Sequence, residues 1–138
     1  MRRKRPRLVW VIAVYQFLAA VWTTLALLLI VGGAVPLAPP QRAYFDDLGS
    51  LELWISIGLA MLNIAASAAL LLLRRAAVFF TGVALMGGVF FSVQQLLMNA
   101  NYRAVLRGPE LLGTIIGLAI STAIFLYSRR LQTQGVLA

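Results

Sequence analysis

The sequence contains no cysteine and no histidine, and charged residues make up only 12% of it. Without cysteine, the chain cannot form a disulfide or carry a thiol relay. The two absences also remove the usual protein ligands of zinc and copper, most haem ligands, and the side chains that carry most nucleophilic and acid–base catalysis. We therefore expect a non-enzymatic protein with no metal and no cofactor.

Acidic residues are also scarce, and four Asp and Glu against twelve Lys and Arg give a formal net charge of +8. Such a charge is typical of proteins that bind nucleic acid. Here, however, the basic residues fall at the ends of apolar segments, where the orientation signals of membrane helices are found. Their placement explains the positive charge, and we expect no nucleic-acid partner.

Hydrophobic residues are what the chain has in abundance, at 62% of the total. A helix needs about 20 mostly apolar residues to cross the hydrocarbon core of a bilayer. Four segments carry no charged residue, namely 8–41, 53–73, 76–102 and 111–128. The sequence therefore predicts an all-α, polytopic membrane protein, with a four-helix transmembrane bundle that forms a single membrane-embedded domain over residues 1–138.

The boundaries of the four helices follow from proline, glycine and charge. We expect helices at about 8–31, 51–73, 76–98 and 109–127, two longer connectors at 32–50 and 99–108, and a short turn at 74–75. Pro36, Pro39 and Pro40 prevent the first connector from continuing the first helix. The short turn makes the second and third helices antiparallel neighbours.

The two faces of the predicted bundle differ in their basic residues. One face carries Arg2, Arg3, Lys4, Arg5, Arg7, Arg74, Arg75, Arg129 and Arg130. The other carries Arg42, Arg103 and Arg107, together with Asp46, Asp47, Glu52 and Glu110. Because Lys and Arg beside a span are retained in the cytoplasm, we predict that both termini are cytoplasmic (N-in/C-in), in a bacterial inner (plasma) membrane. The first apolar run is longer than that of a signal peptide, so we expect it to stay uncleaved.

The N-terminal basic cluster has a second interpretation beside retention. Its members are Arg2, Arg3, Lys4, Arg5 and Arg7. Each basic residue near an anionic membrane surface contributes about 1 kcal/mol of attraction. The expected partners therefore include the lipid bilayer and its anionic head groups.

A few amide side chains fall inside or beside the predicted spans, and they are candidates for a polar lining. They are Gln16, Asn63, Gln94, Gln95 and Asn99. An amide in hydrocarbon must find a partner, so these side chains should face the bundle interior. They either join helices by hydrogen bonds or line a pocket or solute path. The absence of a charged residue within the spans argues against an ion-coupled carrier.

Small residues recur at four-residue steps on the third and fourth helices. The two stripes are Ala84, Gly88 and Ser92, and Gly113, Gly117 and Ser121. Small-xxx-small patterns let helix backbones approach closely. These residues are candidates for helix packing, either within the bundle or between protomers.

The sequence does not by itself identify a ligand or partner. The function it favours is that of a small membrane subunit or scaffold that acts through helix–helix association, with a second copy of itself or with another membrane protein. One alternative is a small passive transporter, lipid translocator or pore with a polar lining. A second alternative is a phage-type membrane-permeabilising protein.

Overall fold

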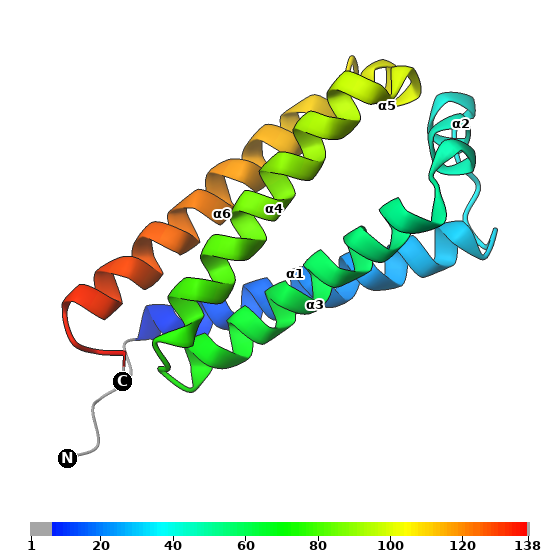
Figure 1. Ribbon diagram of the computed structural model, residues 1–138. Coiled ribbons are helices and arrows are strands. Elements are labelled where there is room, and N and C mark those ends of the chain that lie inside the picture. Colours follow the sequence, from blue (N-terminus) through cyan, green and yellow to red (C-terminus); the bar gives the residue numbers. More distant parts are fainter. Residues whose placement is uncertain (1–6, 138) are drawn as a thin grey trace.

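The computed structural model describes residues 7–137, and within this range it is all-helical (Figure 1). Its helices are α1 (Arg7–Val31), α2 (Pro39–Asp47), α3 (Ser50–Leu71), α4 (Ala76–Met98), α5 (Ala100–Val105) and α6 (Glu110–Thr133). Four of them, α1, α3, α4 and α6, are long and apolar enough to cross a membrane. The predicted all-helical fold with four candidate spans is therefore confirmed.

The four long helices pack in chain order. Helix α1 lies along α3, α3 along α4, and α4 along α6. Among the described residues, α1 and α6 form no contact of comparable extent. In Figure 1, the α1–α3 pair and the α4–α6 pair converge near the turn between α3 and α4 and separate toward α2 and α5. The bundle is thus wedge-shaped, with one side between α1 and α6 left open.

Most Ser and Thr hydroxyl groups within the four long helices donate to a carbonyl of their own helix. Thr23 and Thr81 each donate to a carbonyl oxygen one turn back, at 2.8 Å. Ser128 donates in the same way to the carbonyl of Ile124 at 2.9 Å. Because these bonds stay inside one helix, the hydroxyls can lie at membrane depth without a partner from a neighbouring helix.

Three helices end in the same way, at a residue with a left-handed backbone. These residues are Gly33 (φ 72°), Leu73 (φ 53°) and Gly135 (φ 65°). In each case the next amide donates to a carbonyl near the helix end, at 2.9 to 3.0 Å, which forms a Schellman motif. A left-handed backbone costs a non-glycine residue about 1–2 kcal/mol. Leu73 offsets this cost by packing against a buried apolar cluster.

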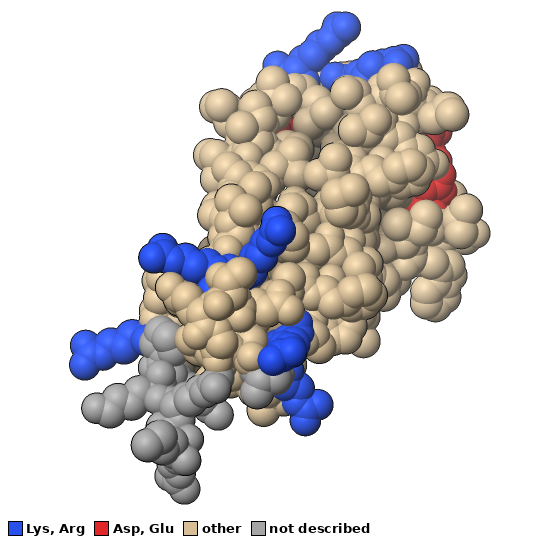
Figure 2. All heavy atoms as spheres, turned by 60° about the vertical axis from the view of Figure 1, so that its left-hand side comes forward, with Lys and Arg blue, Asp and Glu red and all other residues tan. Residues whose placement is uncertain are grey.

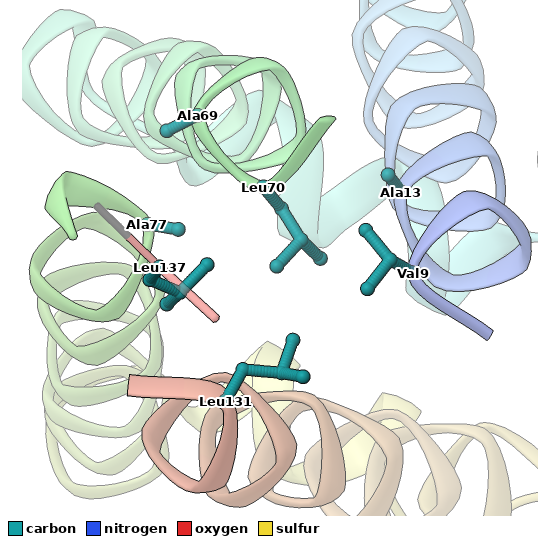
Figure 3. Close-up of a cluster of buried hydrophobic side chains, with 7 residues drawn as sticks. All are labelled: Val9, Ala13, Ala69, Leu70, Ala77, Leu131 and Leu137. Atoms are coloured by element: carbon teal, nitrogen blue, oxygen red, sulfur yellow. The ribbon is translucent and has the colours of Figure 1, made fainter. Parts of the chain in front are cut away.

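That compact apolar cluster joins all four long helices at the end of the bundle that we call the core end. Figure 3 shows its members, which are Val9, Ala13, Ala69, Leu70, Ala77, Leu131 and Leu137. Val9 and Leu70 are fully buried, and Leu137 is 1% exposed. The Gly135 turn carries the chain back so that Leu137 enters this cluster. The core end is therefore closed.

The opposite end, which we call the cap end, is bridged by α2 and α5. The ring of Tyr44 in α2 lies 5.4 Å from that of Tyr102 in α5, centroid to centroid. The amide of Gln41 donates to Glu110 at 3.1 Å, and Asn101 donates to Asp47. These contacts connect the α1–α3 pair to the α4–α6 pair.

The two cap helices lie in segments predicted as loops. Pro39 and Pro40 do not break α2, because they occupy its first turn, where the missing amide hydrogen has no intrahelical partner. In α5, the side chain of Asn99 accepts hydrogen bonds from the backbone amides of Asn101 and Tyr102, at 2.9 and 3.0 Å. The position of the prolines thus allows helix α2, and the Asn99 cap favours helix α5, in segments whose composition indicated only connectors.

Two of the long helices differ in length from their predicted bounds. Helix α3 ends at Leu71, since Leu73 turns the chain. Helix α6 continues past Tyr127 to Thr133, through Arg129 and Arg130. Arginines are favourable in a last turn, because their charge complements the helix dipole and their stems reach past the apolar boundary.

Among the described residues, the charged side chains lie at the two ends of the bundle. Figure 2 shows basic residues at both ends and acidic residues at the cap end alone. Arg7, Arg74 and Arg130 mark the core end, beside the helix termini that carry Val9, Leu70 and Leu131. The predicted separation of charge is present, whereas Arg2, Arg3, Lys4 and Arg5 lie outside the described residues.

The packing of the core end can be tested by truncating one leucine. Leu70→Ala should lower the free energy of unfolding by about 2–4 kcal/mol, because it leaves a cavity in a fully buried cluster. Leu72→Ala is the matched control, since Leu72 is 60% exposed two residues away. Thermal unfolding in mild detergent measures both. Equal shifts in melting temperature for the two variants would show that the core end is not tightly packed.

The aromatic contact of the cap should depend on pH. Burial, followed by the nearby Tyr102 and Glu52, raises the pKa of Tyr44 to about 12. An exposed tyrosine ionises near pH 10. The α2–α5 contact should therefore be at full strength below pH 10 and weaken as the pH rises toward 12. Ultraviolet titration should show a late step whose amplitude falls by one tyrosine in Tyr44→Phe, and a late step of unchanged amplitude would contradict the assignment.

Candidate functional site

The space inside the wedge is a central cavity of about 440 Å³, lined by residues of all four long helices. Its polar side chains are the amides of Gln16 and Asn63 and the hydroxyls of Tyr15, Thr23, Ser56, Thr81 and Ser121. The other lining residues are alanine, glycine, leucine and isoleucine, so none of the described residues around the cavity is charged. The cavity offers hydrogen bonds and apolar walls but no ionic partner.

The cavity opens sideways, between α1 and α6. Its lining residues from α3 and α4, such as Ala60, Asn63 and Ala84, are buried or half-buried. The exposed lining residues come from α1 and α6: Tyr15, Ala19, Thr23, Gly117 and Ser121. Both helices are long and apolar enough to span a membrane, and in a bilayer this mouth would face the lipid. We call the cavity and its mouth the lateral groove.

A short chain of hydrogen bonds forms part of the groove wall. The side-chain nitrogen Nδ2 of Asn63 donates to the carbonyl oxygen of Leu59 at 3.0 Å. The Nε2 nitrogen of Gln16 then donates to Asn63 Oδ1 at 3.2 Å. Gln16 is only 7% exposed, and within residues 7–137 its Oε1 is buried with no hydrogen-bond partner. An unpaired buried acceptor costs about 1–3 kcal/mol, so it marks a place where a donor would bind favourably.

A second hollow of about 380 Å³ adjoins the groove on the side of the cap. It lies among α1, α2 and α3, and it shares Thr23, Ser56 and Ala60 with the central cavity. Aromatic side chains, Trp22, Tyr44 and Phe45, form part of its wall. The two hollows together run from the amide pair toward the cap end and become more aromatic on the way.

Comparisons of the chain with protein families, with curated proteins and with solved structures give no match. No relative therefore contributes a ligand, a reaction or a partner. The function has to be inferred from the groove itself, which offers one free acceptor, several hydroxyls and apolar walls.

Of the predicted polar lining, the structure brings Gln16 and Asn63 together and leaves the other three elsewhere. Gln95 is 4% exposed within α4 and Gln94 is half-buried, and neither lines the two hollows. Asn99 is the cap of α5. Gln16 and Asn63 thus both join two helices by a hydrogen bond and line a cavity. The sequence left these two roles as alternatives.

The glycines of the two small-residue stripes do not lie at the close helix contacts of the bundle. A Cβ added at Gly88, Gly113 or Gly117 would meet no atom within 4 Å outside its own helix turn. The tight positions are Gly82, where an added Cβ would lie 3.1 Å from Phe125, and Gly87, where it would lie 2.8 Å from Leu59. Ala84, Gly88, Gly117 and Ser121 instead line the groove, while Ser92 and Gly113 do not. In these stripes, small side chains leave space open.

Apart from Ser121, the hydroxyl residues of the groove were not identified from the sequence, although the sequence contained a signal for two of them. Thr23 lies seven residues after Gln16 on α1, and Ser56 lies seven residues before Asn63 on α3. Residues seven apart share one helix face. An amide that faces the interior therefore predicts that these hydroxyls face it too.

The amide pair can be tested with a double-mutant cycle on Gln16→Leu and Asn63→Leu. The coupling free energy should be about 0.6–1.7 kcal/mol, the range measured for hydrogen bonds between membrane helices. Reversible unfolding in detergent or bicelles measures it. The control cycle pairs Asn63→Leu with Gln94→Leu and should give no coupling, because Gln94 lies outside the groove wall. Equal coupling in both cycles would refute the pairing.

Proposed function

We propose that this chain is a small non-enzymatic integral membrane protein that binds a molecule dissolved in the bilayer. The observation that supports this function is the lateral groove, which opens between α1 and α6 and has among its lining residues Gln16, whose Oε1 is buried without a hydrogen-bond partner. A ligand would enter from the lipid, and no soluble domain would be needed. This proposal extends the lipid-translocator alternative of the sequence toward binding within the membrane.

The ends of the bundle favour lateral binding over a transmembrane pore. A pore needs a continuous polar path from one face to the other. Val9, Leu70, Leu131 and Leu137 fill the core end with apolar side chains. The contacts of α2 with α5 cover the cap end. The open side is therefore the natural route into the cavity.

The proposed orientation places the core end in the cytoplasm. Arg7, Arg74, Arg75, Arg129 and Arg130 lie at this end, and the positive-inside tendency of bacterial inner-membrane proteins supports both termini on the cytoplasmic side. The same basic residues would contact anionic lipid head groups. The cap with its four carboxylates then faces outward.

A second candidate is association through α6, which keeps the scaffold interpretation of the sequence. Gly113, Gly117 and Ser121 are all exposed on this helix. The absence of any neighbouring atom within 4 Å of a Cβ at Gly113 or Gly117 leaves room for a second backbone to approach closely. The partner would be a second copy of the chain or another membrane helix.

Two glycines on α6 separate these functions. Gly117→Leu would fill the mouth of the groove, whereas Gly113→Leu alters the same stripe outside it. If the groove binds a ligand, native mass spectrometry after mild purification should show a small hydrophobic molecule retained by Gly113→Leu and lost from Gly117→Leu. Size-exclusion chromatography with light scattering measures the oligomeric state of the same two variants. Loss of oligomers in both variants, with no change in bound ligand, would favour association and reject the groove.

A further inference from the structure

The polarity of the hydrogen-bond chain in the groove specifies the ligand. We propose that the groove takes a neutral, lipophilic molecule whose polar group is a hydroxyl, and that this hydroxyl donates to Gln16 Oε1. The inference rests on the proposed binding function and names the chemical class of its ligand.

The direction of hydrogen bonding determines that the ligand must be a donor. The carbonyl oxygen of Leu59 can only accept, so the side chain of Asn63 turns its Nδ2 group toward it. This leaves Asn63 Oδ1 to face Gln16, which must present Nε2. Gln16 Oε1 is then the unpaired end of the chain, and because the atom is buried, a ligand reaches it when the Gln16 side chain turns toward the groove. Turning either amide over would place two acceptors or two donors against each other, so the unpaired group stays an acceptor.

The surroundings of Gln16 determine that the ligand is neutral. Among the described residues, no charged side chain lines the groove, so a phosphate, carboxylate or ammonium group would have no counter-charge. With a rise of 1.5 Å per residue, Gln16 lies about 14 Å along α1 from Arg7, and Asn63 about 12 Å along α3 from Leu71. Both depths are inside the hydrocarbon region, where an isolated charge is expensive.

The volume of the groove suits a small molecule. A cavity of about 440 Å³ falls within the range of small-molecule sites. The adjoining aromatic hollow of about 380 Å³ gives the apolar part of the ligand a place toward the cap. Trp22, in that wall, lies about 9 Å along α1 from Gln16.

The test uses Trp22 as a reporter and a matched pair of probes. Of the three tryptophans, Trp10 and Trp54 are replaced by phenylalanine so that Trp22 alone fluoresces. The probes are a long-chain alcohol with a terminal bromine, which quenches tryptophan, and its methyl ether, which lacks the donor. In nanodiscs, the alcohol should quench Trp22 saturably, with an affinity about fivefold higher than that of the ether, as one net hydrogen bond provides. The bromo-acid and bromo-amine of equal length should bind more weakly than the alcohol.

Three variants assign the preference to Gln16. Gln16→Met keeps the size of the side chain but removes the acceptor, so alcohol and ether should bind equally. Gln94→Met, which removes an amide from outside the groove, should keep the fivefold preference. Asn63→Leu frees the Gln16 amide to turn and offer its Nε2 donor, so the ether should gain affinity and the preference should shrink. This last variant keeps the idea testable if Gln16→Met fails to fold.

The possible failures are distinguishable. A preference for the alcohol that persists in Gln16→Met would overturn the assignment of Gln16 Oε1 as the acceptor of the ligand's hydroxyl. Equal binding of both probes to the parent protein would overturn it too, and bound water would then satisfy Gln16 Oε1. The proposed groove function would still hold in both cases if Gly117→Leu abolishes saturable quenching. Quenching that never saturates, or that Gly117→Leu leaves unchanged, would reject the groove itself.

Discussion

The structure depends on one constraint, which is that polar groups at membrane depth must find hydrogen-bond partners within the protein. Helices satisfy the backbone, and Thr23, Thr81 and Ser128 return their hydroxyls to their own helices. Asn63 bonds both to its own helix and to α1 through Gln16. Against this background, Gln16 Oε1 is the exception, the one buried polar side-chain atom within residues 7–137 that has no hydrogen-bond partner, and Gln16 lines the cavity. A ligand that donates a hydrogen bond there would remove the exception.

The shape of the bundle follows from where its contacts are strongest. Apolar side chains pack tightly at the core end, and amide–carboxylate and aromatic contacts bridge the cap end. Between these ends, Ala84, Gly88 and Gly117 are too small to fill the space between the two helix pairs. A four-helix chain that packs in sequence order, with α1 and α6 apart, therefore keeps one lateral opening.

Much of the fold could be predicted, because hydropathy and charge are local properties of the chain. The four spans, the gathering of Arg74 and Arg130 at one end and the inward-facing amides follow from the cost of polar groups in hydrocarbon. The cap helices were not predicted, since prolines in a first turn resemble those of a loop. The sequence also could not show which glycines lie at close helix contacts. Gly87 and Gly88 are adjacent in sequence, and only their neighbours in space distinguish them.

The all-helical character, the four candidate spans and the position of the charges outside them can be predicted from the chain alone, because each depends on the transfer of single residues between water and hydrocarbon. Which polar residues meet depends on how the helices pack. Gln16 reaches Asn63 but not Gln94, since the register and tilt of packed helices set distances that no local pattern contains. The same packing left α1 and α6 apart and so created the groove from which the function is inferred.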